Sequence, residues 1–85
     1  MLSLDELKIN QRAIIKKIEC DKIVKIRLLD MGFQNGEEII YVLNSPSKLI
    51  KAYLIKNTLI AIRNSDVKNI LVEVIDNENS FNRKS

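Results

Sequence analysis

The stretch from residue 23 to residue 40 constrains this fold most, because both glycines of the chain, Gly32 and Gly36, lie within it. Glycine takes positive φ more readily than any other residue, so each glycine marks a place where the backbone can reverse. The apolar run before Gly32 predicts a helix that ends there, with Phe33 placed to pack back on Leu28 in a Schellman ending. Gly36 then turns the chain into a second apolar run. A helix, its cap, a turn and a strand therefore follow one another within one short span.

The predicted helix, residues 23–31, carries apolar side chains on two sides. At about 100° per residue, the stripe on one side consists of Val24, Leu28 and Met31, and the stripe on the other consists of Ile23, Ile26 and Leu29. A surface helix normally has one apolar face and one polar face. Either this helix is fully buried, or short with an irregular end, or one stripe packs on the domain while the other meets a partner. The spacing alone does not decide whether Leu28 or Leu29 faces outward.

Five other segments are predicted to be short strands. They span residues 12–18, 38–43, 49–55, 58–63 and 70–75. Ser3 and Glu6 form a capping-box pattern that predicts one helical turn at the start, and a second helical turn is expected at 67–69. Strands at this spacing, with one helix inserted after the first, favour a small closed or partly closed β-barrel. The predicted fold is therefore mainly β, with one inserted α-helix and short helical turns.

Apolar side chains are predicted on both faces of several strands, although a barrel interior takes only one face. In the first strand, for example, Ile14 and Ile18 share one face and Ala13 and Ile15 share the other. A large exposed apolar patch commonly marks an interaction site. We therefore expect residues 1–76 to form one domain with an interaction surface, and the polar residues 77–85 to form a disordered tail.

Composition argues against catalysis and against a metal centre. The 85 residues include no histidine and one cysteine, Cys20, so the chain has no imidazole or thiolate ligand set and no base to activate that thiol. Lys22 is expected to lower the pKa of Cys20 slightly. No enzymatic activity, metal or cofactor is expected. The chain also has no apolar run near the ~20 residues of a membrane span and no signal-peptide pattern at its start.

The net charge of +3 is small and its charges are well mixed along the chain. Nucleic-acid binders usually concentrate basic residues in a patch, so no nucleic acid is expected as a partner. The alternative depends on Tyr41 and Tyr53, the only strand aromatics, because aromatics beside lysines can stack bases. Both tyrosines are expected to be half-buried barrel residues instead.

Residues 28–39 resemble a known family. Leu28-Leu29-Asp30-Met31-Gly32-Phe33, followed by Gly36 and Ile39, are similar to the L-L-x-(L/M)-G-(L/M/F)-x-x-G-x-x-(I/V/F) core of FeoA, the small cytosolic partner of the bacterial ferrous iron transporter FeoB. The opening L-S-L-D-E-L and the later A-I-R, followed by Asp66, Ile70, Val72 and Glu73, extend the resemblance over nearly the whole folded part. This chain departs from the family at Asn10, Asn35, the Pro46 loop and the Lys56-Asn57 turn, where the family often has glycine or proline.

The resemblance implies an SH3-like barrel of five or six strands and a cytoplasmic role in ferrous iron uptake, recruited to the membrane through FeoB without inserting into it. Transition metal ion binding is a family-level term that does not make this chain an iron carrier. The residues expected to bind the partner are Lys25, Ile26, Arg27, Leu28, Leu29, Met31 and Phe33, with Gly32 and Gly36 as structural turn residues. Ile26, Leu29 and Phe33 would be the anchors, and Lys25 and Arg27 the charged rim.

Two other hypotheses stay open. One is a stand-alone SH3-like regulatory or nucleic-acid-binding barrel, similar to the C-terminal domain of iron-dependent repressors. The other is assistance to the GTPase of the transporter, with Arg27 or Arg63 stabilising developing charge. Weak self-association is also left open.

Overall fold

Apolar strands joined by short turns pair with their neighbours, and the computed structural model of the protein, which describes residues 1–75, shows one antiparallel sheet. Its strands are β1 (Leu2–Ser3), β2 (Arg12–Ile18), β3 (Glu38–Asn44), β4 (Ile50–Ile55), β5 (Thr58–Arg63) and β6 (Ile70–Val74). Its helices are the 3-10 turn η1 (Leu4–Glu6), α1 (Lys22–Asp30) and α2 (Asn64–Val67). The strand order is β1-β6-β2-β3-β4-β5, so the two chain-terminal strands lie side by side.

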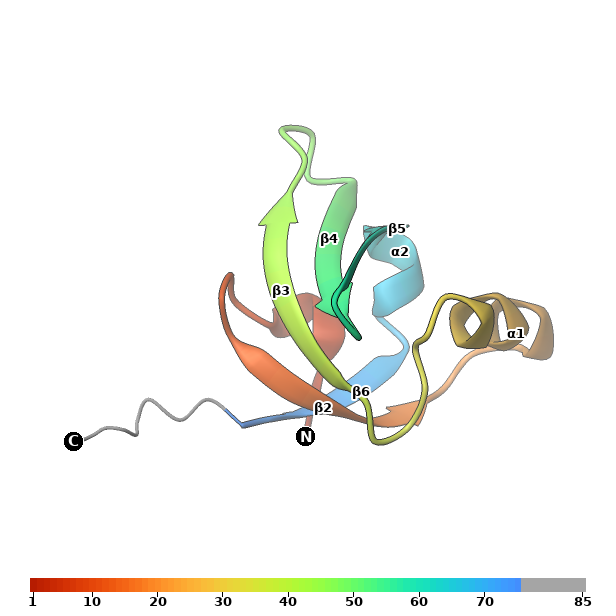
Figure 1. Ribbon diagram of the computed structural model, residues 1–85. Coiled ribbons are helices and arrows are strands. Elements are labelled where there is room, and N and C mark those ends of the chain that lie inside the picture. The colour runs from red at the N-terminus through yellow and green to blue at the C-terminus, as the bar shows by residue number, and fades with distance from the viewer. Residues whose placement is uncertain (76–85) are drawn as a thin grey trace.

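The sheet curls so that β2 and β6 lie below β3, β4 and β5 (Figure 1). Two β-bulges assist this bending, one between Ile15 and Lys17 in β2 and one between Tyr41 and Leu43 in β3. A bulge inserts one extra residue and so changes which face the following side chain occupies. Ile18 is therefore buried on the face of Ile15, and the prediction that it shares a face with Ile14 was wrong.

The β3 bulge corrects a second prediction in the same way. Alternation along the strand predicts that Leu43 shares a face with Tyr41, but the bulge turns the Leu43 side chain to solvent. Such irregularities are set by how paired strands fit together, which is why residue alternation did not reveal them.

The predicted boundaries match the structure for β2 and β5, and those of β3, β4 and β6 differ by one residue at one end. The strand β1 was not expected, and its pairing of Leu2 with Val72 depends on a segment far along the chain. The second helical turn was predicted at 67–69 but occupies Asn64–Val67, directly after β5. The predicted domain end at residue 76 and the tail 77–85 lie outside the described residues.

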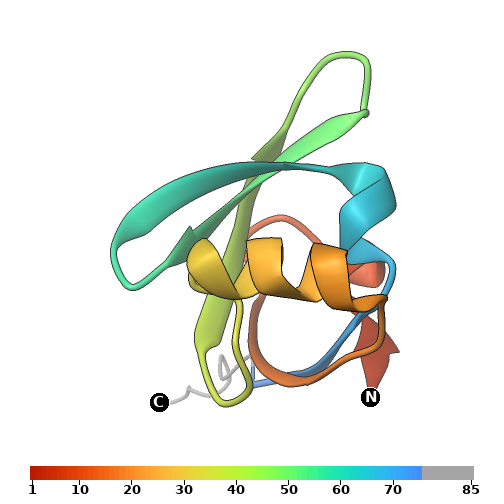
Figure 2. The same cartoon turned by 90° about the vertical axis from the view of Figure 1, so that its right-hand side faces the viewer.

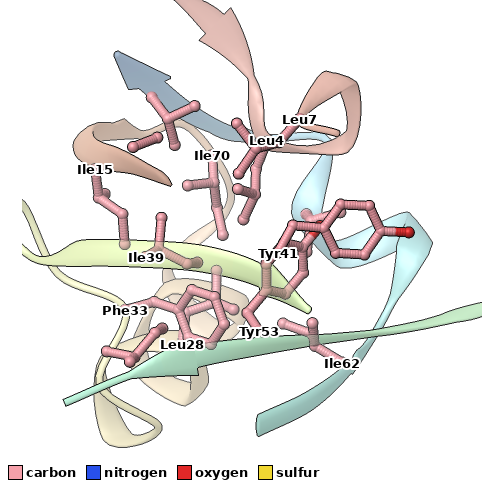
Figure 3. Packing of buried hydrophobic residues seen from close by; sticks show 14 of the residues in the cluster. Leu4, Leu7, Ile15, Leu28, Phe33, Ile39, Tyr41, Tyr53, Ile62 and Ile70 are labelled. Atoms are coloured by element: carbon pink, nitrogen blue, oxygen red, sulfur yellow. The ribbon is translucent and has the colours of Figure 1, made fainter. Parts of the chain in front are cut away.

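Aromatic and branched aliphatic side chains fill the inside of the curled sheet (Figure 3). The ring of Tyr53 lies between Phe33, with centroids 6.4 Å apart in an edge-on arrangement, and Tyr41, with centroids 5.2 Å apart. Both tyrosines are fully buried, not half-buried as expected. The Tyr41 hydroxyl accepts a hydrogen bond from Asn44 Nδ2 at 2.9 Å.

Among residues 1–75 four non-glycine residues adopt positive φ, namely Asn10, Lys48, Lys56 and Asn57, and all lie where this chain departs from the resemblance described above. Asn10 has φ of 72°, and Lys56 and Asn57 have φ of 53° and 64° in the two-residue turn between β4 and β5. Asparagine enters the left-handed region more easily than most residues because its short polar side chain can bond locally. These departures from the family therefore leave the turns in place.

Leu28 and Leu29 provide a matched test of how α1 is oriented. Leu28 is 1% exposed, whereas Leu29 is 41% exposed. Leu28→Ala should lower the free energy of unfolding by about 2–5 kcal/mol, because it leaves a cavity in the core. Leu29→Ala should cost less than about 1 kcal/mol, since surface substitutions usually have small effects. Urea unfolding followed by circular dichroism measures both, and equal losses would contradict the observed orientation.

Gly32 and Gly36 provide a test of backbone strain. Their φ angles are +104° and +90°, and an added Cβ would have ordinary contact with Ile55 in the first case and open space in the second. Gly32→Ala and Gly36→Ala should each cost about 1–2 kcal/mol, because the left-handed region is strained for residues with a Cβ. A much larger loss at Gly32 than at Gly36 in urea unfolding would show that packing, not φ, sets the requirement.

Candidate interaction surface of the inserted helix

Helix α1 is fixed at both of its ends by local hydrogen bonds. Asp21 caps the first turn, since its carboxylate accepts the Val24 N–H at 2.9 Å. At the other end the Gly32 N–H donates to the Leu29 carbonyl at 3.0 Å and the Phe33 N–H to the Leu28 carbonyl at 2.9 Å. This is the Schellman ending predicted from the sequence. The Asp21 cap was not predicted, although an aspartate just before an apolar helical run is a recognised N-cap signal.

The inner side of α1 packs on the barrel core. Leu28 and Phe33 are 1% and 0% exposed, and Val24 is partly buried against the same cluster (Figure 3). Leu28 and Phe33 were expected to contact a partner, which requires exposed side chains. That expectation is wrong, because both side chains are buried in the core. The cause is the Schellman ending, which folds Phe33 back under the helix into the core.

The outer side of α1 exposes three large aliphatic side chains, which we call the outer ridge: Ile23, Ile26 and Leu29. They are 74%, 50% and 41% exposed. Figure 2 shows α1 lying across the near side of the barrel, with β5 and α2 above it. The helix is thus not fully buried, and its two apolar stripes divide between core and solvent. Ile23 belongs with Ile26 by its spacing of three residues, yet the predicted partner-binding set did not include it.

Met31 departs from the stripe that the helical pattern assigned to it. The pattern placed it in one stripe with Val24 and Leu28, whose side chains face the core, but the Met31 side chain is 37% exposed. The reason is that α1 ends at Asp30, and Met31 is the C-cap residue from which the chain turns into Gly32. Its place in the predicted partner-binding set stays a prediction.

Three exposed cations accompany the outer ridge: Lys22, Lys25 and Arg27. Among residues 1–75 the five ion pairs are Arg12–Glu38, Lys16–Glu73, Lys17–Glu19, Lys56–Glu37 and Arg63–Asp66. None involves a residue of α1, so these cations form no ion pair within the described part of the chain. Asp30 is the one acidic side chain of α1.

Two shallow hollows lie elsewhere on the surface, and neither includes α1. One, about 280 Å³ in volume, is lined by Glu37, Glu38, Ile40, Leu54, Lys56 and Asn57. The other, about 320 Å³, is lined by Leu49, Arg63, Asn64, Ser65 and Lys68. Small-molecule sites are generally concave clefts of roughly 300–1,000 Å³ with converging polar groups, and both hollows are open and lie at or just below the bottom of that range. The helix surface is therefore the better candidate for function.

Burial raises the pKa of the Cys20 thiol, and the neighbouring Asp21 raises it further. The expectation that Lys22 lowers this pKa was wrong. The cation that lowers it is Lys25, and desolvation of the thiol outweighs that effect. A raised pKa leaves the thiol mostly protonated, and the thiolate is the reactive form. Within residues 1–75 no three His, Cys, Asp or Glu side chains are grouped to hold a metal ion.

None of the helices between residues 1 and 75 combines the length and apolar character needed to cross a membrane. The buried Tyr53 hydroxyl has no hydrogen-bond partner within the described range, and burial raises the pKa of this hydroxyl. With both tyrosines buried, neither offers a base-stacking face at the surface.

Comparison with known proteins agrees with the fold and the helix insertion. The family model of the FeoA domain matches residues 2–74. No curated protein matches the chain. The structure of an FeoA-like protein from Clostridium acetobutylicum is 28% identical and has a TM-score of 0.80, with 87% of this chain and 86% of that chain covered.

Two further solved structures extend the likeness. Iron(II) transport protein A from Clostridium thermocellum is 32% identical with a TM-score of 0.83, over 87% of this chain and 46% of that chain. FeoA from Stenotrophomonas maltophilia, a prokaryotic SH3 domain protein complexed with zinc, is 25% identical with a TM-score of 0.69, over 86% and 91%. The repressor ScaR, at 19% identity, shares the fold over 36% of its length.

The family model spans nearly all of the described residues, and the sheet and inserted helix agree with SH3-like relatives. This chain belongs to the FeoA family of SH3-like domains, which is associated with iron transport.

Proposed function

We propose that this protein is a cytosolic accessory protein of bacterial ferrous iron uptake that docks on the cytosolic part of a FeoB-type transporter. Family membership supports the process, and the outer ridge supports the mode of action. The single observation that carries the proposal is that a helix held rigidly at both ends leaves three large aliphatic side chains facing solvent. Soluble domains seldom expose such a group unless it meets another surface.

The rigidity of α1 favours binding because little order has to be created on association. The Asp21 cap and the Gly32 turn hold the helix from both ends, while Leu28 anchors it in the core. Loops and side chains that must be ordered on binding cost free energy, and a preformed surface avoids most of that cost. The outer ridge therefore presents itself to a partner in one arrangement.

The size of the outer ridge limits the binding free energy that it can contribute. Fully burying an aliphatic side chain is worth about 1.5–3 kcal/mol, and these three are already partly covered. The ridge thus supplies a few kcal/mol and acts as the anchor within a wider contact, since a standard interface buries about 800 Å² per partner. Iron is the cargo of the transporter in this proposal, and the role of this chain is to bind and regulate that transporter.

Leu29→Arg should weaken binding to the detergent-solubilised FeoB-type transporter of the same organism by at least about tenfold, because anchor residues carry most of the binding energy. Leu49→Arg is the matched control: Leu49 is 68% exposed and lies in the connection between β3 and β4, outside α1. That control should bind within about twofold of the parent protein. Dissociation constants from biolayer interferometry measure both.

Circular dichroism and urea unfolding establish that each variant stays folded. Normal binding by Leu29→Arg, or no binding by the parent protein, would overturn the proposal. A folded Leu49→Arg variant that binds as poorly as Leu29→Arg would show that the contact lies elsewhere.

A further inference from the structure

We infer that α1 docks against an acidic α-helix of the partner. The outer ridge packs into a groove between side chains of that helix, and the carboxylates of that helix face Lys22, Lys25 and Arg27. This inference rests on the proposed function, because it specifies the chemistry of the surface to which the protein docks. It is argued from the charges on α1 and from the spacing of the outer ridge.

Among residues 1–75, Lys8, Lys48, Lys51 and Lys68 also lie outside the five ion pairs, but α1 is the one element that carries three such cations. Each strand cation that forms an ion pair, such as Lys16 with Glu73 or Arg12 with Glu38, already has its counter-charge. The three cations of α1 form no ion pair among residues 1–75. Covering them with a neutral surface would remove water without replacing it, which is costly for any charge. An acidic surface compensates that cost and also steers the encounter.

The arrangement of these groups around α1 fits a complementary surface of limited width. At about 100° per residue, Ile26 lies nearly opposite the buried Leu28 and so occupies the middle of the outer side. Lys25 and Arg27 lie on either flank of Ile26, and Lys22 lies near it one turn earlier. The outer side therefore has Ile26 near its centre and positive charge on both margins, with the single carboxylate of Asp30 one turn after Ile26.

The spacing of the outer ridge favours a helix as the occupant. Ile23, Ile26 and Leu29 follow one another at intervals of three residues. Such rows form the ridges that fit into the grooves between side chains of a second helix, with axes about 8–10 Å apart. An acidic residue on each side of that groove would then lie opposite Lys25 and Arg27.

An anionic membrane surface fits these observations less well. A helix that lies in a membrane interface separates one wholly apolar face from a polar face. The nine residues of α1 instead use one apolar side for the core and mix apolar and charged groups on the other.

The test compares two double charge reversals in binding to the same solubilised transporter. Lys25→Glu with Arg27→Glu removes positive charge from α1. Lys8→Glu with Lys48→Glu is the matched control, because both lysines are exposed, form no ion pair among the described residues and lie off the helix. The two variants have the same net charge. Surface plasmon resonance gives association rate constants from about 50 to about 500 mM KCl, a range over which screening becomes strong.

For the parent protein the association rate should fall by about tenfold or more across this range, as electrostatically steered encounters do. The α1 variant should bind at least about tenfold more weakly and lose most of that salt dependence, whereas the control should keep both properties within about threefold. A photoreactive amino acid at position 26 should cross-link to a helical segment of the transporter that contains Asp or Glu.

Other outcomes separate this inference from the proposed function. If Leu29→Arg abolishes binding while the α1 charge reversal behaves like its control, the acidic site is refuted and docking through the outer ridge stands. If neither substitution weakens binding, both fail. Cross-linking to a strand, to a loop or to a segment without acidic residues overturns the inference. So does equally tight, charge-dependent binding to vesicles of phosphatidylcholine and phosphatidylglycerol without the transporter.

Discussion

The hydrogen bond from the Phe33 N–H to the Leu28 carbonyl, 2.9 Å long, connects the inserted helix to the barrel. It closes the Schellman ending, and because Gly32 takes a φ of +104° the chain can reverse there and carry Phe33 into the core. Phe33 then meets the edge of Tyr53 on β4, so the end of the helix is tied to the centre of the sheet. The rotation of α1, and with it the choice of side chains left in solvent, follows from this one turn.

That turn also explains how a small chain can expose so much aliphatic surface and remain a defined fold. The core cluster needs only one side of α1, since strands from both halves of the sheet supply the rest. The outer ridge can therefore be occupied by a partner without withdrawing any side chain from the interior. Lys22, Lys25 and Arg27 reach solvent beside it and keep this surface hydrated while it is unoccupied.

Much of the fold was predictable because local chemistry determined it. The glycine pair and Leu28-to-Phe33 spacing gave the helix ending, and apolar segments bounded by turn residues gave five of the six strands. The errors came where strand pairing decides: the bulges that moved Ile18 and Leu43, and the short β1 that pairs with β6. At the site, periodicity revealed two apolar stripes on the helix but not which of them faces the core. Only the packing of Phe33 placed Leu28 inside, and Met31 left its stripe because the helix ends one residue before it.

The pairing of β1 with β6 affects the order in which parts of the domain can fold. Leu2 lies opposite Val72 and Ser3 opposite Leu71, so the sheet joins nearly the first and nearly the last described residues. The meander of β3, β4 and β5 closes through short connections, whereas the β2–β6 and β1–β6 ladders must wait for the end of the chain. Non-local pairing slows folding because a long loop has to be closed before the contacts form. During synthesis the hairpins can therefore assemble first, and the nascent chain keeps its barrel unfinished until residues 70–74 have emerged from the ribosome.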